Sequence, residues 1–375
     1  MEINETKRLG FGCMRLPMLG GAEGTVDLAQ FSQMIDRYLA AGFGYFDTAR
    51  VYLGGQSETA LRECLVKRYP RDAFILTDKL SGSQFQCEAD ILPLFQSQLD
   101  AMGVTFFDYY LMHSQSAAVY EKFMNCNAYE VVRQLKAAGK IRHMGISFHD
   151  KAEVLEKILK EHPEIEVVQI QFNYLDVSSP SIDSMGVYEV CRRYQKPVFV
   201  MEPVKGGVLA QLPEQAQQLL QTLGTDQCPA NYAIRYAASF EGVSMVLSGM
   251  SDLAQMDSNL AVMQSFQPLT EQEHQVLSRI TEILKAQDMI QCTGCRYCTA
   301  GCPRRIRIPD LFSCANTKKR YGDWSSDYYY QLHTFEAGKP EDCIRCRKCE
   351  RICPQHLQIT ELLQQVARLF RQEQA

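Results

Sequence analysis

The 375-residue sequence lacks the marks of a membrane protein, a secreted protein or a nucleic-acid-binding protein. No apolar run reaches the ~18 residues that a membrane span needs, and the N-terminal stretch MEINETKRLG lacks the apolar core of a signal peptide. An excess of cations is missing too, because 39 Lys and Arg stand against 44 Asp and Glu, a net charge of −5. We therefore expect a cytoplasmic globular protein of two or three domains that binds neither membrane nor nucleic acid.

Cysteine is the exception in this ordinary composition, because the chain holds 15 cysteines. Seven are scattered, and eight lie in two tight groups after residue 290. In a chain with no sign of export, such groups favour metal binding over disulfides. The eight grouped cysteines are Cys292, Cys295, Cys298, Cys302, Cys343, Cys346, Cys349 and Cys353.

Both groups follow the spacing C-x2-C-x2-C-x3-C-P, which is that of bacterial ferredoxins with two 4Fe–4S clusters. In this pattern the fourth cysteine of each run binds the cluster of the other run. The first cluster would take Cys292, Cys295, Cys298 and Cys353, and the second would take Cys343, Cys346, Cys349 and Cys302. Zinc also uses four-cysteine sites, typically as two C-x-x-C pairs, but it needs neither the third close cysteine nor the proline. We therefore predict two iron–sulfur clusters.

The region around these cysteines is basic, with 12 Lys and Arg against 7 Asp and Glu in residues 292–354. Three explanations fit this balance: cations that stabilise anionic clusters, a solvated basic face, or a docking site for an acidic electron carrier. The 40-residue segment between the runs is long for a compact ferredoxin, and Ile308-Pro309-Asp310 begins a helical pattern. This resembles an α-helical ferredoxin module, which we place in residues 289–375.

Residues 8 to about 250 repeat a unit of one strand and one helix. Eight units of about 30 residues predict a (β/α)8 TIM barrel, here within residues 1–288. A doubly wound sheet would need a G-x-G-x-x-G turn, which is absent after the first run. A long last step leaves room for an extra helix. The expected strands are Leu9–Cys13, Tyr45–Thr48, Phe74–Lys79, Tyr109–His113, Met144–Ser147, Val167–Gln171, Val198–Glu202 and Met245–Gly249.

Four polar residues stand at or just beyond the ends of consecutive expected strands: Asp47, Tyr52, Lys79 and His113. The C-terminal ends of barrel strands line the active site of such folds. An ammonium group beside a tyrosine favours the phenolate, a carboxylate fixes the ammonium, and a histidine can orient a carbonyl oxygen. Each residue alone is more often structural, but together they predict a proton-donor site.

Three stretches resemble the aldo-keto reductase family: LGFGCMRLP at 9–17, DTARVYLGGQSE at 47–58 and GKIRHMGIS at 139–147. With the cysteine runs behind them, the chain resembles the ferredoxin-linked aldo-keto reductases of bacteria and archaea. The resemblance implies a (β/α)8 barrel and NAD(P)H as hydride donor. It also implies a catalytic tetrad of Asp47, Tyr52, Lys79 and His113, in which Tyr52 gives the proton to the carbonyl oxygen.

The same resemblance implies contacts to the nicotinamide cofactor. Ser147 and Gln169 match residues that hold the carboxamide, and Met201 stands where an aromatic ring often stacks. The stretch SGMSDLAQMDSN resembles the adenosine-phosphate loop, with its contacts at Gly249, Met250, Ser251, Gln255 and Asn259. Family members that prefer NADPH usually place cations where Gly249 and Gln255 stand, so the resemblance favours NADH and leaves NADPH open.

Three functions fit these features. The first is an oxidoreductase of a small carbonyl-like or unsaturated substrate, whose clusters pass single electrons to or from a partner such as an acidic ferredoxin or flavodoxin. The second is an ordinary NAD(P)H carbonyl reductase with structural clusters, and the third is a non-enzymatic electron-transfer or interaction protein. A hydride carries two electrons and a cluster one, so joining them normally needs a flavin or a similar group, for which the sequence has no fingerprint. We favour the first function.

Overall fold

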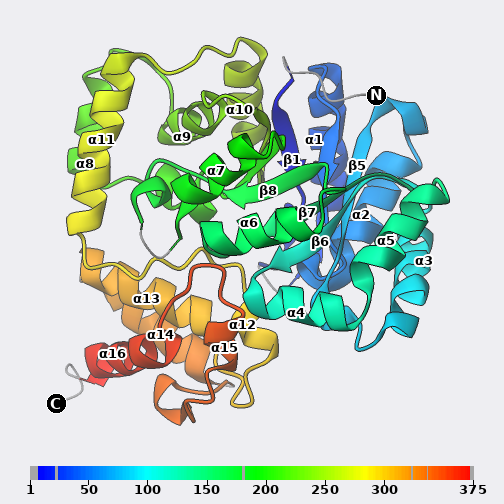
Figure 1. Ribbon diagram of the computed structural model, residues 1–375. Helices are drawn as coiled ribbons and strands as arrows, with labels where there is room; N and C mark the ends of the chain where they lie inside the picture. The colour runs from blue at the N-terminus through cyan, green and yellow to red at the C-terminus, as the bar shows by residue number, and fades with distance from the viewer. Residues whose placement is uncertain (1–6, 22–23, 180–181, 322–323, 336, 372–375) are drawn as a thin grey trace. The chain divides into compact units, whose positions relative to one another are not determined.

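The computed structural model describes residues 7–21, 24–179, 182–321, 324–335 and 337–371 (Figure 1). The chain divides into two compact units. The first unit comprises residues 1–204 and 223–275, and the second comprises residues 205–222 and 276–375. Residues 205–222, which follow the seventh barrel strand in the sequence, thus group with the cysteine-rich segment. None of the helices in the described ranges is both long enough and apolar enough to cross a membrane.

The first unit is a closed barrel of eight parallel strands, in the order β1-β10-β9-β8-β7-β6-β5-β4. The (β/α)8 barrel prediction is therefore confirmed, and each expected strand lies within three residues of an observed one. The strands are β1 (Leu9–Gly12), β4 (Tyr45–Asp47), β5 (Ile75–Leu80), β6 (Phe107–Gln115), β7 (Ile141–Phe148), β8 (Val167–Gln171), β9 (Val198–Met201) and β10 (Val243–Ser248).

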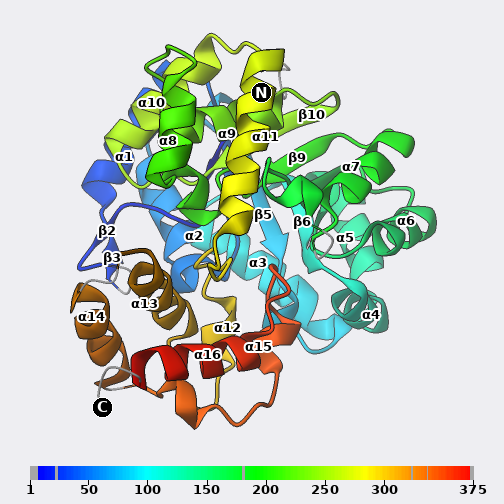
Figure 2. The ribbon, with the colours of Figure 1, turned by 90° about the vertical axis from the view of Figure 1, so that its left-hand side faces the viewer.

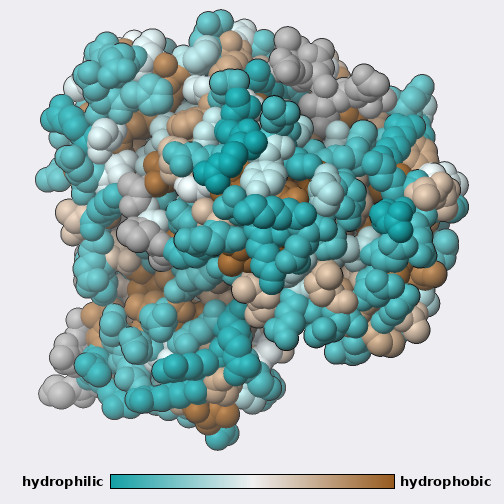
Figure 3. All heavy atoms as spheres, viewed as in Figure 1, coloured by the Kyte–Doolittle hydropathy of each residue, from teal (hydrophilic) through white to brown (hydrophobic). Residues whose placement is uncertain are grey.

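The helices of the first unit lie outside these strands (Figure 1). They are α1 (Leu28–Ala40), α2 (Gln56–Leu61), α3 (Ile91–Met102), α4 (Ala117–Asn125), α5 (Ala128–Ala137), α6 (Ala152–Glu161), α7 (Ser184–Arg193), α9 (Pro229–Ala238) and α10 (Leu253–Gln264), and α11 (Glu271–Ala286) runs on into the second unit. A short antiparallel hairpin, β2 (Met18–Leu19) with β3 (Thr25–Val26), was not expected from the sequence. The surface in Figure 3 is mostly hydrophilic, with scattered apolar residues.

Helix α1 illustrates how the sequence produces these elements. The Asp27 carboxylate accepts a hydrogen bond from Gln30 N at 3.0 Å and so caps the helix. The buried residues Phe31, Met34, Ile35 and Tyr38 recur at helical spacing and form one apolar face. Tyr38 Oη then donates to the backbone oxygens of β1 and β4, at 2.6 and 3.0 Å, which ties the helix to the barrel wall.

Apolar side chains fill the barrel interior. Tyr45, Ile75, Leu111, Val167, Phe199, Met245 and Leu247 form one buried cluster. Gly145 is needed beside this cluster, because a Cβ atom there would lie 2.6 Å from Val167 O. This packed interior makes the barrel a core rather than a pore, so polar chemistry is left to the strand ends.

The second unit is mainly helical, as predicted. Among its described residues the only β pairing is a single bridge between Ile306 and Gly338. Helices α13, α14 and α16 pack against one another (Figures 1 and 2), and Tyr330 stacks on Phe370 with ring centres 4.0 Å apart. The helices are α8 (Glu214–Gln221), α12 (Tyr297–Ala300), α13 (Ile308–Tyr321), α14 (Trp324–Phe335), α15 (Lys348–Arg351) and α16 (Ile359–Arg371).

Candidate active site and cluster-binding loops

The structure brings the four predicted tetrad residues together at the C-terminal ends of β4, β5 and β6. Lys79 Nζ lies 2.5 Å from Asp47 Oδ1 and 3.3 Å from Tyr52 Oη. The rings of Tyr52 and His113 meet edge to face, with centres 5.9 Å apart. All four residues are buried: Lys79 has no exposed surface, and Tyr52 is 8% exposed.

The buried ammonium of Lys79 is held by three oxygen atoms. Besides Asp47 and Tyr52, it donates to Thr48 O at 2.8 Å. Burying a charge is costly unless it is paired and hydrogen-bonded, so these partners fix the ammonium in one place. An ammonium at this distance stabilises negative charge on Tyr52 Oη, which helps the phenol to release its proton.

His113 is held in a neutral state beside this lysine. Burial lowers the pKa of His113 well below its ordinary value, and the Lys79 charge lowers it further. Its Nδ1 atom lies 2.7 Å from Ser81 Oγ, which fixes the orientation of the ring. Ser81 follows β5 and carries no sequence motif, so it could not be identified from the sequence.

The residues expected to contact the nicotinamide ring lie at the same rim. Ser147 of β7 and Gln169 of β8 are register partners. Gln169 Nε2 donates to Asp47 Oδ2 at 3.0 Å, and Ser147 Oγ accepts from Ser114 N at 2.7 Å. Gln169 therefore connects the tetrad to the expected carboxamide position, while Met201 ends β9 and is partly exposed.

The residues expected to contact adenosine phosphate surround the start of α10. Gly249, Met250 and Ser251 follow β10, and Asn259 Nδ2 donates to Ser248 Oγ at 3.0 Å. Gln255 is occupied locally, since its Oε1 accepts from Ser251 N at 3.0 Å and its Nε2 donates to Asp252 Oδ2 at 2.7 Å. Asp252, which the sequence did not single out, caps α10 and places a carboxylate in this loop.

A buried polar network behind Lys79 was also missed. Glu58 pairs with Arg50 at 2.9 Å, and Asp78 Oδ1 accepts from the Lys79 N–H at 2.7 Å. Gln98 donates to Glu58 Oε1 and to Lys79 O, at 3.4 and 3.1 Å. Burial, with the neighbouring Glu58 carboxylate, raises the pKa of Asp78 well above its ordinary value. Burial therefore favours the protonated form of Asp78 in the folded barrel.

Replacing Asp78 by asparagine should make stability less dependent on pH. An acid whose folded pKa is raised loses stability as the pH climbs from its unfolded pKa, about 3.9, towards the folded pKa, at up to ~1.4 kcal/mol per pH unit. Asparagine keeps the oxygen that accepts from Lys79 and removes the titration. In urea unfolding between about pH 5 and pH 8, the free energy of unfolding of Asp78→Asn should decline less steeply than that of wild type. The exposed Asp72→Asn is the control, and parallel curves for wild type and Asp78→Asn would contradict the assignment.

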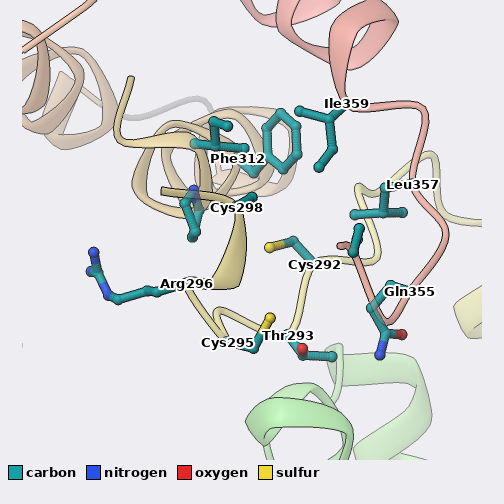
Figure 4. Close-up of a pocket in the computed structure, with 12 residues that line it drawn as sticks. Cys292, Thr293, Cys295, Arg296, Cys298, Phe312, Gln355, Leu357 and Ile359 are labelled. Carbon is teal, nitrogen blue, oxygen red and sulfur yellow. The ribbon is translucent and has the colours of Figure 1, made fainter. Parts of the chain in front are cut away.

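Four cysteines of the second unit line one cavity (Figure 4). They are Cys292, Cys295, Cys298 and Cys353, the set that the spacing assigns to the first cluster. Burial raises the pKa of the Cys298 thiol, and the neighbouring Cys295 and Cys292 raise it further. Since bound iron stabilises thiolates, the donor set and its apolar surroundings fit a cluster. No three His, Cys, Asp or Glu side chains in the described ranges are grouped as one metal ion would require.

The second set comes from three places: Cys302 follows α12, Cys343 and Cys346 precede α15, and Cys349 lies in α15. Three of these cysteines, Cys302, Cys343 and Cys349, pack against the same apolar core as the first set. The two C-x-x-C-x-x-C loops also share a backbone shape. Gly294 and Arg296 have positive φ in the first loop, as do Arg345 and Arg347 at the equivalent positions of the second.

Two residues of the 205–222 segment, Lys205 and Gly206, contact residues that line the cavity of the first cysteine set. Lys205 is buried, and its Nζ donates to Gln355 Oε1 at 3.1 Å. Gly206 packs so closely that a Cβ atom there would lie 2.5 Å from Thr293 O. The sequence stretch VMEPVKGG gave no sign of this contact, because it joins residues about 90 and 150 positions apart, beyond the reach of any local pattern.

Comparison with known proteins decides the family. Residues 8–282 match the aldo/keto reductase family. The chain belongs to the aldo/keto reductase family. Residues 291–359 match a 4Fe-4S dicluster domain, which confirms the prediction of iron–sulfur clusters over zinc. The predicted combination of an aldo/keto reductase barrel and a ferredoxin-type domain is therefore confirmed.

Individual relatives support the fold of the barrel. Aldo-keto reductase AKR11C1 from Bacillus halodurans, in its holo form, is 25% identical, with a TM-score of 0.60 over 73% of this chain and 91% of that one. An aldo/keto reductase from Klebsiella pneumoniae in complex with NADP and acetate is 17% identical, with a TM-score of 0.59 over 73% and 91% of the two chains.

Among curated proteins, an aldo-keto reductase of Mycobacterium sp. (strain KMS) is 32% identical over 109 residues, which cover 29% of this chain and 37% of that protein. The matched stretches span only 8% to 37% of the first curated relatives.

Proposed function

We propose that this protein is an NAD(P)H-dependent oxidoreductase of a small carbonyl-like or unsaturated substrate, and that its clusters exchange single electrons with a partner. The observation that carries this proposal is the hydrogen-bonded series Asp47–Lys79–Tyr52 at the barrel rim. It stands in the same chain as a 4Fe-4S dicluster domain. Reduction of a carbonyl requires a proton and a hydride; Tyr52 fits the role of proton donor, and the dicluster domain adds a site for one-electron transfer.

The tetrad side chains have separate tasks in this proposal. Tyr52 Oη donates its proton to the substrate oxygen, and the Lys79 ammonium at 3.3 Å stabilises the phenolate that remains. Asp47 keeps that ammonium in place. Neutral His113, oriented by Ser81, directs a ring N–H toward the substrate oxygen and favours the charge that develops there.

The nicotinamide cofactor supplies a hydride when it is bound. Ser147 and Gln169 lie on adjacent strands at the height of the tetrad, so their polar groups fit a carboxamide held against the reacting carbon. The hydrogen bond between Gln169 and Asp47 orients both side chains, one toward the expected carboxamide and one toward Lys79. Met201 offers an apolar surface for the ring.

The clusters supply one-electron transfer when they are bound. Two clusters together could hold the two electrons of one hydride. A flavin, or another group stable at one electron, is needed to join hydride transfer to one-electron transfer. The second unit would hold the clusters. Four of its cysteines line one cavity: Cys292, Cys295, Cys298 and Cys353.

Anaerobic purification tests both halves of the proposal. We expect a brown protein with about eight irons and eight sulfides per chain, which reduces members of a panel of aldehydes, ketones and enones with NADH or NADPH. A colourless protein, or a wild type that turns over no member of the panel with either nicotinamide, would leave only a barrel scaffold.

We expect NADH to be preferred over NADPH. The Asp252 carboxylate at the start of α10 repels an added phosphate, and Gly249 and Gln255 offer no cation to offset it. Asp252→Ser keeps a capping oxygen and removes the charge, so it should lower the KM for NADPH about two- to fivefold and leave the KM for NADH nearly unchanged. The measurement is kcat/KM for both cofactors. A wild type that strongly prefers NADPH would contradict this inference.

A further inference from the structure

The second cysteine loop carries an exposed basic surface that the proposed function leaves unexplained. We define the second-loop face as six exposed residues between Cys343 and Cys353. Two are apolar, with Ile344 54% and Ile352 49% exposed. The other four are cations, namely Arg345, Arg347, Lys348 and Arg351. The face therefore joins exposed apolar side chains to concentrated positive charge beside predicted cluster ligands.

Among the residues that the structure describes, one cation of this face, Arg347, lies in an ion pair. Arg347 lies 3.7 Å from Glu350, the one acid of the loop, which also accepts from Thr360 N at 2.8 Å. Arg345 lies beside the uncharged Gln364 amide of α16. Arg351 Nη2 donates to Cys346 O at 3.4 Å, so a cation of the face touches the backbone of a predicted cluster ligand.

The first cysteine loop differs in both charge and exposure. Its one cation, Arg296, is partly buried and pairs with Asp310 at 2.5 and 3.0 Å. Thr293 and Cys298 of that loop are buried, and Gly206 packs against Thr293. Thus the first loop is covered within its own unit, whereas the second loop is open and basic.

The backbone of the second loop places a cation, Arg345, where the first loop has glycine. Arg345 and Arg347 both adopt positive φ, at 54° and 57°. The first loop places Gly294 at the position equivalent to Arg345. A side chain with positive φ costs free energy that glycine avoids, so the loop would be more stable with glycine there. Strain of this kind concentrates at functional sites.

We propose that the second-loop face is the docking site of an acidic one-electron carrier protein. This inference rests on the proposed function, in which the clusters carry electrons. The positive face attracts an acidic partner. The chain as a whole has a net charge of −5 and repels that partner elsewhere, so electrostatics steers it to this face. Exposed isoleucines beside cations have the anatomy of a transient interface. When bound, the second cluster would give up one electron, which the flavin or iron–sulfur cluster of the carrier would take up.

Stopped-flow mixing tests this docking site without any nicotinamide. The holoprotein is reduced with dithionite, freed of excess reductant and mixed anaerobically with an oxidised acidic flavodoxin. We expect the second-order rate constant to fall at least about tenfold as salt is raised. Arg345→Glu/Lys348→Glu should be about tenfold slower than wild type at low salt and nearly insensitive to salt.

The matched control is Lys157→Glu/Lys160→Glu on α6, which makes the same charge change at two exposed lysines. It should stay within about twofold of wild type. Reduction potentials and EPR spectra of both variants should match wild type, since the ligands are untouched. If the charge reversal prevents cluster loading, Arg345→Gln/Lys348→Gln replaces it and should lose about half of the salt dependence.

The outcomes separate docking from the proposed function. A rate that does not depend on salt, an unchanged rate in the Arg345/Lys348 variant, or equal losses in both variants would overturn the docking site. If dithionite-reduced protein behaves as expected and NAD(P)H never reduces the clusters, the docking site stands and the proposed function fails.

Discussion

Tyr52→Phe is expected to lower kcat for carbonyl reduction by ~10²–10⁴, the range that general acid catalysis contributes. The substitution removes only the hydroxyl that lies 3.3 Å from Lys79 Nζ, and the ring centre, 5.9 Å from that of His113, is unchanged. The ring that packs beneath the Lys79 ammonium remains. The transition state loses its proton donor, while the barrel keeps its shape and its cofactor positions.

Single-turnover kinetics with bound NAD(P)H measure this effect directly. Binding of the nicotinamide, followed by its fluorescence, should stay within about twofold of wild type, because no expected cofactor contact is altered. Tyr69→Phe is the matched control, since the Tyr69 hydroxyl bonds Asp36 outside the tetrad. A Tyr52→Phe variant that retains most of the wild-type rate would assign the proton transfer to another group.

Cys295→Ser is expected to remove the first cluster and about half of the iron, since each 4Fe–4S cluster needs its four ligands. Electron transfer to an artificial one-electron acceptor should collapse, while the circular dichroism of the barrel persists. If the clusters serve structure alone, carbonyl reduction will instead survive in proportion to the remaining stability. The two results separate a redox enzyme from a reductase with structural clusters.

The same experiment tests which cysteines share a cluster. Cys353 lines the cavity of Cys292, Cys295 and Cys298, so Cys353→Ser should reproduce the EPR spectrum of Cys295→Ser. Cys302→Ser should give the other spectrum. Cys314→Ser, which changes a buried cysteine of the same apolar core, should keep about eight irons. Identical spectra for Cys353→Ser and Cys302→Ser would contradict the crossed pairing.

The barrel could be predicted because its strands are short apolar runs at regular intervals. The start of β7 could not be predicted, because Arg142 and His143 are polar. They belong to the strand because Ile141 pairs with Phe107 and His143 pairs with Tyr109 on β6. The helix that begins at Gln56 changes type for a similar reason. It runs as α2 and then as a π-helical turn over Arg62–Val66, which depends on packing rather than on local propensity.

The site was predictable where spacing or a strand end marks a residue. The tetrad and the cysteines fall in this class. Ser81, Asp78 and Lys205 do not, because each acts through a contact that the fold creates, such as the 3.1 Å bond from Lys205 to Gln355. Likewise, the positive φ of Arg345 is visible only in the folded loop. These residues orient or lie beside the catalytic and cluster-binding residues, and none of them belongs to a sequence motif.

The coupling of the barrel to the clusters is tested most directly by anaerobic titration of the holoprotein with NADH and with NADPH, followed by visible absorption and EPR. We predict that the broad visible absorption bleaches in proportion to the nicotinamide added, with up to about two electrons stored per chain and the EPR signal of reduced clusters appearing. The coupling would be contradicted if dithionite reduces the clusters but neither nicotinamide does, whether or not a carbonyl substrate or a flavin is added.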